Sequence, residues 1–120
     1  MRDQIVAGNW KMNNDQNETQ TLLNALKSYS KPKNVRVMVA PSFTQLSQSV
    51  SLLGDDVITV AAQNVNAAAS GAYTGEVSVS MLKGVGVETV ILGHSERRSL
   101  YHENNASLAN KVNTSIESGM

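Results

Sequence analysis

Four short, almost uninterrupted apolar runs limit this chain to a small number of folds. The runs are rich in valine and isoleucine, and they begin about 20 to 30 residues apart, as in strand–helix–strand units. Continuous runs suit strands buried on both faces of a parallel sheet better than the alternating pattern of half-exposed antiparallel strands. The predicted strands cover residues 5–7, 35–40, 57–62 and 89–92.

A helical pattern follows each of these runs. Asp15 and Glu18 have the three-residue spacing of a capping box, and Ser42 and Gln45 repeat it. Apolar residues then recur at helical spacing until a glycine or a proline intervenes. The predicted helices stop at Pro32, Gly54, Gly84 and Gly119.

The third predicted helix covers residues 79–83, and the fourth carries an apolar stripe of Leu108, Val112 and Ile116. The order is therefore strand then helix, four times, which predicts one α/β domain over residues 1–120 with right-handed crossovers. Periodicity leaves two architectures open. One is an open, doubly wound sheet, and the other is half of an eightfold barrel, which in full takes about 250 residues.

Charge and composition exclude several classes of function. Ten basic and ten acidic residues cancel, so no overall field draws the chain to nucleic acid or to an anionic membrane. With no cysteine and two histidines, we expect no disulfide, no metal site and metal-free chemistry. We see no secretion signal and no run of membrane-spanning length, so the expected compartment is the cytoplasm.

The residues just after each predicted strand are the best candidates for a functional site, because the C-terminal ends of parallel strands lie at one rim of the sheet. An amide and a cation, Asn9 and Lys11, follow the first strand, although a lone lysine there is more often a solvated surface charge. Gln63 and Asn64 follow the third strand. The glycine-containing loop over residues 71–76 then fits either partner contact or plain exposure.

His94 stands between the end of the fourth predicted strand and a predicted helix start. The free N–H groups and the positive end of the helix dipole disfavour an added proton there. We therefore expect a neutral imidazole that donates a hydrogen bond, which suits polarising a carbonyl. Taken alone, His94 fits a buried structural histidine equally well.

Four motifs stand in order across residues 5–98: G-N-W-K-M-N, A-A-Q-N, G-A-Y-T-G-E-V-S and I-L-G-H-S-E-R-R. Together they resemble the triosephosphate isomerase family. The resemblance implies a TIM barrel, (β/α)8, of which this chain supplies units one to four, a half-barrel of about four strands and four helices. It also implies that the helix after His94 extends to Gly119.

The activity implied by this resemblance is interconversion of dihydroxyacetone phosphate and D-glyceraldehyde 3-phosphate through an enediol or enediolate, in glycolysis and gluconeogenesis and without a cofactor. Lys11 matches the family's cation for the substrate phosphate and the developing oxyanion. Asn9 matches its oxygen-binding neighbour, and His94 matches the electrophile. Glu96 matches a supporting carboxylate, with a surface salt bridge to Lys11 or Arg97 as its competing interpretation.

The resemblance further implies a homodimer. Thr74 matches the tip of a loop that enters the partner subunit and braces its lysine and histidine. Glu76 and Arg97 match residues at the subunit interface. A small phosphorylated triose and a second copy of the chain are thus the expected partners.

The chain departs from the family pattern in one catalytic respect. Proton abstraction needs a base within about 3 Å, and the family places its glutamate after a sixth strand, a segment absent from this sequence together with the lid and the later phosphate loops. Glu96 and Glu103 do not match that base. We therefore expect a truncated chain that is inactive alone, and the alternative is a non-catalytic, self-associating half-barrel.

Overall fold

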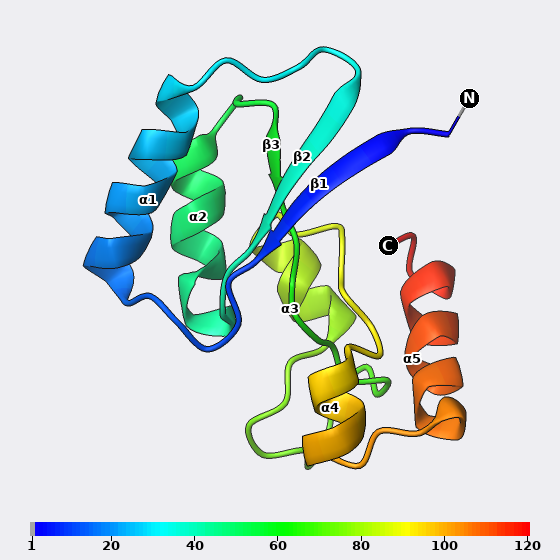
Figure 1. Cartoon of the computed structure of the whole chain (residues 1–120). Coiled ribbons are helices and arrows are strands. Elements are labelled where there is room, and N and C mark those ends of the chain that lie inside the picture. The colour runs from blue at the N-terminus through cyan, green and yellow to red at the C-terminus, as the bar shows by residue number, and fades with distance from the viewer. Residues whose placement is uncertain (1) are drawn as a thin grey trace.

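The computed structural model describes residues 2–120 and contains a three-stranded parallel sheet in the order β1-β2-β3. The strands are β1 (Gln4–Asn9), β2 (Val35–Ala40) and β3 (Ile58–Val60). In the first register, Gln4 pairs with Val35 and Asn9 pairs with Ala40, so both strands end at the same rim. The predicted parallel α/β arrangement is confirmed (Figure 1).

The fourth predicted strand forms only a single parallel bridge, between Ala62 and Val90. The Ala62 N–H donates to the Thr89 carbonyl, and the Ile91 N–H donates to the Ala62 carbonyl, both at 2.8 Å. Within residues 2–120 no strand pairs with the other side of this segment, so the ladder does not extend. The predicted count of about four strands therefore becomes three strands and a bridge.

Helices alternate with these strands and exceed the predicted number of four. They are α1 (Gln16–Ser28), the short 3-10 helix η1 (Phe43–Gln45), α2 (Leu46–Leu53), α3 (Val79–Gly84), α4 (Ser95–Leu100) and α5 (Asn105–Glu117). The Asp15 carboxylate accepts from the Glu18 N–H and the Glu18 carboxylate accepts from the Asp15 N–H, both at 2.9 Å, which confirms that capping box. The capping box predicted from Ser42 and Gln45 is wrong. The Ser42 side chain bonds to the Thr44 hydroxyl instead, and η1 precedes α2.

The expectation of one helix from His94 to Gly119 is wrong. Residues 101–104 separate α4 from α5, and His102 has the left-handed φ of 57°. Asn104 starts α5 afresh, since its side chain accepts from the Ser107 N–H at 2.9 Å and the Ser107 hydroxyl accepts from the Asn104 N–H. An asparagine cap competes with helix continuation by giving the backbone a local partner, which accounts for the break.

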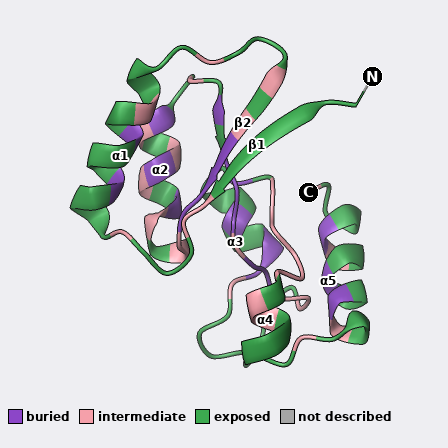
Figure 2. Ribbon diagram, in the orientation of Figure 1, coloured by how far each residue is buried: buried purple, intermediate pink, exposed green. Residues whose placement is uncertain are grey.

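The core lies between the sheet and the helices α1, α2 and α3, and α1 and α2 lie side by side along the sheet (Figure 1). Its fully buried members include Leu23, Leu82, Val65 and Val87. The first predicted strand is not buried, because β1 lies at the sheet edge and five of its six residues are exposed, as Figure 2 shows. An edge strand that no helix covers keeps both its outer edge and its side chains in water.

Helix α5 buries a different face from the one that its apolar stripe predicts. Leu108 is buried, but Val112 is 39% exposed and Ile116 is 67% exposed, whereas Lys111 and Ser115 are buried. The apolar residues line an open groove beside Val90 and Leu92. No helix in residues 2–120 is long and apolar enough to cross a membrane.

Candidate active site

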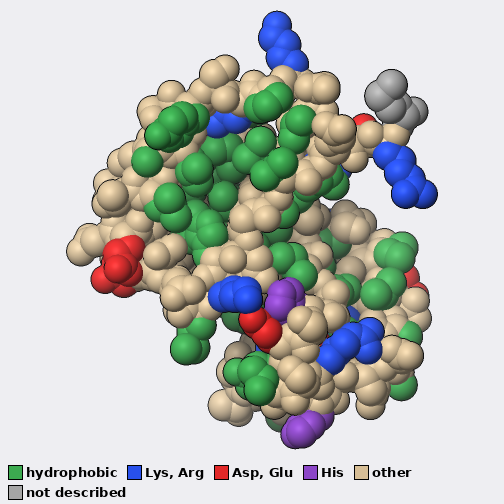
Figure 3. All heavy atoms as spheres, in the orientation of Figure 1, with side chains coloured by type: hydrophobic (Ala, Val, Ile, Leu, Met, Phe, Trp, Pro, Cys, Tyr) green, Lys and Arg blue, Asp and Glu red, His purple; other side chains and the backbone are tan. Residues whose placement is uncertain are grey.

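A pocket at the C-terminal ends of the strands brings together most of the side chains that the sequence singles out. It has a volume of about 280 Å³, and its lining includes Asn9, Lys11, Gln63, His94, Glu96 and Arg97. Figure 3 shows basic, acidic and histidine side chains side by side in a hollow on this face. A rim where parallel strands end is the usual place for a site in this architecture.

The loop after β1 holds Lys11 in an unusual backbone conformation. Lys11 has a φ of 57°, in the left-handed region that costs a residue with a side chain about 1–2 kcal/mol. The Lys11 N–H donates to the Asn9 side-chain oxygen at 3.0 Å, and the Trp10 N–H donates to the Ala40 carbonyl at 3.0 Å. Strained residues of this kind cluster at functional sites because the surrounding bonds fix them.

The Lys11 ammonium lies 2.5 Å from a carboxylate oxygen of Glu96. This is the salt bridge that the sequence offered as the competing interpretation of Glu96. Both side chains are about half exposed, at 51% and 45%. The hydrogen bond from Lys11 lowers the pKa of the Glu96 carboxyl, and the positive charge of Lys11 acts in the same direction. Glu96 is therefore an ionised and weakly basic carboxylate.

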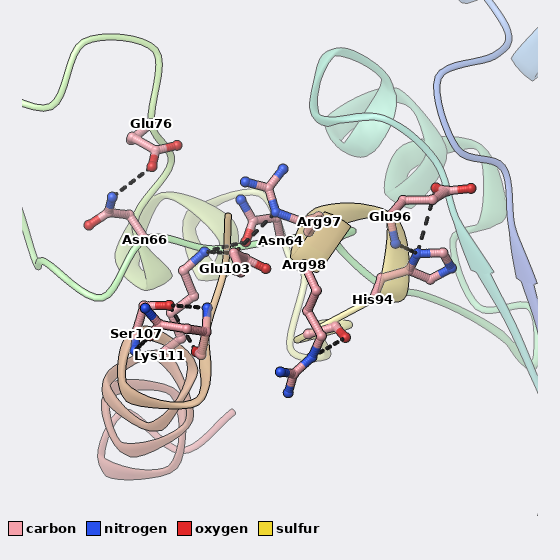
Figure 4. Close-up of polar contacts among 12 residues, drawn as sticks. Asn64, Asn66, Glu76, His94, Glu96, Arg97, Arg98, Glu103, Ser107 and Lys111 are labelled. Atoms are coloured by element: carbon pink, nitrogen blue, oxygen red, sulfur yellow. Dashed lines mark hydrogen bonds and ion pairs between the residues drawn. The ribbon is translucent and has the colours of Figure 1, made fainter. Parts of the chain in front are cut away.

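His94 is the N-cap of α4. Its Nδ1 accepts a hydrogen bond from the Glu96 N–H at 3.1 Å, so Nδ1 carries no proton and the neutral imidazole has its hydrogen on Nε2. Nδ1 also lies 3.6 Å from a Glu96 carboxylate oxygen, but the hydrogen bond that it accepts comes from the Glu96 N–H. Figure 4 shows this pair at the start of α4.

Arg97 belongs to a partly buried charge cluster on the other side of α4 (Figure 4). Its Nε lies 3.1 Å from a Glu103 carboxylate oxygen, and that same oxygen accepts from Lys111. Lys111 also donates to the Asn64 side-chain oxygen at 2.8 Å. Burial alone raises the pKa of Glu103, whose side chain is 6% exposed, but the bonds from Lys111 and Arg97 outweigh it and the net pKa is lowered.

Two of the predicted interface residues lie outside the pocket. Thr74 and Glu76 belong to the exposed loop over residues 71–76, and Glu76 accepts from the Asn66 side chain at 2.9 Å. The third, Arg97, lines the pocket and places its guanidinium 4.9 Å above the Tyr101 ring. The structure thus separates the loop residues from the group of Asn9, Lys11, His94 and Glu96.

A larger hollow of about 430 Å³ lies near the opposite rim, where β3 begins. Its charged lining residues are Arg36, Asp56 and Glu88. The Ile58 N–H lowers the pKa of Asp56, burial opposes this, and Lys31 adds to the lowering through an ion pair at 3.4 Å. We place the candidate site in the smaller pocket, because it alone of the two contains a histidine, a lysine and the strand C-termini.

Two residues have structural roles that the sequence does not reveal: Gln63 in the pocket, and Lys111 in the charge cluster next to it. The sequence assigns no role to Gln63, although its position directly after the third predicted strand is a usable signal. Lys111 is buried, at 8% exposure, although it lies in a stretch with the pattern of an exposed helix surface. Its partner Asn64 is distant in sequence and its partner Glu103 lies before the start of α5, so helical spacing does not indicate either contact. No group of His, Asp and Glu residues within 2–120 is placed to share a metal ion.

The fold and the pocket first define a class: parallel α/β proteins built of strand–helix units, with a polar site at the C-terminal rim of the sheet, as in (β/α) barrels. The sequence model of triosephosphate isomerase matches residues 4–120. The chain therefore belongs to the triosephosphate isomerase family.

Named relatives agree over nearly the whole chain. A triosephosphate isomerase of Flavobacterium johnsoniae is 50% identical over 121 residues, covering 100% of this chain and 48% of the relative. Those of Flavobacterium psychrophilum and Saccharomyces cerevisiae are 48% and 43% identical and are themselves covered to 48% and 47%. The chain thus spans about half the length of these relatives.

Proposed function

We propose that this chain carries the substrate-binding and electrophilic part of a triose-phosphate isomerase, which interconverts dihydroxyacetone phosphate and D-glyceraldehyde 3-phosphate. The observation that carries the proposal is the pocket that the Lys11 ammonium and the His94 imidazole both line, with His94 Nδ1 already bonded to the Glu96 N–H. Family membership and the names of the relatives support the choice of reaction. By the same reasoning the pathway is glycolysis and gluconeogenesis, and the compartment is the cytoplasm.

Each pocket residue has a role that follows from its chemistry. Lys11 meets the substrate phosphate and the developing enediolate oxygen, because an ammonium stabilises negative charge best in a pre-organised place. The Nε2–H of His94 donates to the substrate carbonyl oxygen, since Nδ1 is already bonded to the Glu96 N–H. The Asn9 amide fixes Lys11 through its backbone N–H and lies at the same wall.

Proton transfer between the two carbons requires a base that these 120 residues do not offer. Glu96 is paired with Lys11 and its pKa is lowered, so it is a poor proton acceptor. Glu103 is held by Lys111 and Arg97 on the far side of α4. We therefore propose that the chain alone has no useful turnover and that a glutamate outside it completes the reaction.

The partner proposed for the assembled enzyme is a second copy of itself. Thr74 and Glu76 occupy an exposed loop, which leaves them free to contact another subunit. Arg97 lines the active pocket and is 29% exposed, so a partner's loop would meet it at the rim. This proposal rests on the match of these three residues to the family's interface positions.

Complementation tests the proposed activity. The purified chain is mixed with a separately made C-terminal half of the 50%-identical Flavobacterium johnsoniae relative, and isomerase turnover is followed in a coupled assay. We expect turnover only in the mixture, and its loss in Lys11→Ala and in His94→Gln. The exposed Lys33→Ala is the matched control and should retain turnover.

A second candidate function is a non-catalytic, self-associating half-barrel. The exposed edge strand β1, with Ile5 51% and Val6 62% exposed, is the observation that favours it. A mixture in which both halves are folded and bound to each other but show no turnover would support this candidate. Turnover of the chain by itself would instead contradict our assignment of the base to an outside segment.

A further inference from the structure

The Gln63 side chain bonds to two carbonyls from two different segments. Its amide nitrogen donates to the Lys11 carbonyl at 2.9 Å and to the Ala40 carbonyl at 2.7 Å. Both partners are acceptors only, so the NH₂ group of the amide must face them. Gln63 therefore ties the loop after β1 to the end of β2.

The carbonyl that Gln63 holds belongs to the strained residue of the loop. Lys11 has a φ of 57°, and its N–H is already bonded to the Asn9 side chain. Gln63 fixes the opposite, carbonyl side of the same residue. With one hydrogen bond on each side, the left-handed conformation of Lys11 is over-determined, which is the condition under which such strain persists.

Ala40 provides a rigid anchor for this arrangement. Its carbonyl accepts both the Gln63 amide and the Trp10 N–H, the latter at 3.0 Å, and Ala40 itself is buried. The loop is thus fastened to the sheet at two consecutive residues, Trp10 and Lys11. The Lys11 side chain is half exposed and its ammonium pairs with Glu96, so the backbone conformation of Lys11 sets the direction from which the ammonium reaches this partner and the pocket.

We propose that Gln63 is a positioning residue that locks the left-handed backbone of Lys11 and thereby aims the Lys11 ammonium into the pocket. Gln63 does not itself have to touch substrate, since it acts through Lys11. The inference rests on the proposed function for its catalytic meaning, but its structural content, a backbone conformation that depends on Gln63, can be measured without turnover.

Two substitutions remove the donors in different ways. Gln63→Met keeps the length of the side chain without a donor or a charge, and Gln63→Glu keeps the shape but replaces both N–H groups by a carboxylate. Gln20→Met, on the exposed surface of α1, is the matched control. The 120-residue chain is labelled with ¹⁵N and ¹³C, and the Cα and Cβ chemical shifts of Lys11 report its φ. Inorganic phosphate is then titrated while the Lys11 and His94 signals are followed.

We expect both Gln63 variants to lose the left-handed signature of Lys11 and to bind phosphate about tenfold more weakly, with the other signals and the control unchanged. Unchanged Lys11 shifts in both variants would overturn the proposal. General unfolding of both would also overturn it, since Gln63 would then be a structural residue. If the unaltered chain binds no phosphate, the proposed function is in doubt, while the Lys11 shifts still decide the role of Gln63.

In the complemented enzyme the same variants separate positioning from general support. A misplaced ammonium weakens contacts made both to bound substrate and to the transition state, so kcat/KM should fall with KM raised. A fall in the amount of active enzyme with unchanged KM would contradict a positioning role.

Discussion

The ion pair of Lys11 and Glu96 is short, but we expect it to contribute little to the stability of the fold. Both side chains are about half exposed, and exposed pairs gain little because water screens them and ordering two long side chains costs entropy. We expect Glu96→Gln to leave the thermal unfolding temperature almost unchanged, as measured by circular dichroism. A marked drop would show that the pair supports the fold rather than the pocket.

Gly93, directly before His94, has a backbone conformation that favours glycine. Its φ is 71°, and an added Cβ would lie 3.1 Å from a Leu108 methyl carbon. We expect Gly93→Ala to lower the free energy of unfolding by at least about 1–2 kcal/mol, measured by urea denaturation. Gly84→Ala is the matched control, because nothing lies within 4 Å of its Cβ, and it should be neutral or slightly stabilising. Equal effects of the two changes would refute this reasoning.

At the scale of elements, the cluster of Arg97, Glu103 and Lys111 joins α4 to α5 across the break between them. Removing the carboxylate leaves two cations without their counter-charge. We expect Glu103→Leu to destabilise the chain near the lower end of roughly 3–5 kcal/mol, because Arg97 keeps some contact with water. Chemical denaturation measures this loss, and a neutral result would mean that the cations find other partners.

The same carboxyl predicts a pH dependence. The folded pKa of Glu103 lies below its ordinary value of 4.5, so its contribution is fully present above about pH 4.5 and is lost as the pH falls through the folded value. The free energy of unfolding should therefore fall less steeply with acid in Glu103→Gln than in the parent chain. Glu117→Gln, on the exposed last turn of α5, is the control and should leave the slope unchanged.

Some boundaries of helices could be predicted from the local sequence, and others could not. The start of α1 was predictable because Asp15 and Glu18 bond only to each other's backbone, a contact contained within four residues. The break before α5 was not, because an apolar stripe says nothing about whether the preceding turn is already helical. Lys111 is buried against Asn64, which the fold brings from a distant part of the chain, and helical spacing cannot predict such a contact.

At the scale of the whole molecule, the sheet is unevenly protected. β2 lies between two strands, whereas β1 has a partner on one side only and is exposed along five of its six residues. We expect amides of β1 to exchange with deuterium well before those of residues 38–40 in β2, as measured by mass spectrometry. Adding the complementary half should slow exchange in β1. Equal exchange in the two strands of the isolated chain would contradict the uneven protection.

The sequence predicted which residues belong to the site better than it predicted how they are arranged. Asn9, Lys11 and His94 come together because parallel strands end on one rim, which the order of strands and helices already implied. The positive φ of Lys11, the bonds of Gln63 and the charge cluster behind α4 depend on three-dimensional contacts. The fourth strand is reduced to a bridge for a similar reason, since strand length depends on neighbours as well as on composition.

His94 as a helix cap has a consequence for how the protein can evolve. Imidazole is an uncommon cap, and asparagine, aspartate and serine generally suit that position better. A laboratory selection for heat resistance alone would therefore favour replacing His94, and would remove the proposed electrophile as it did so. A descendant of this chain in which position 94 is no longer under selection for the proposed chemistry should drift toward those residues and should become more thermostable as it does so.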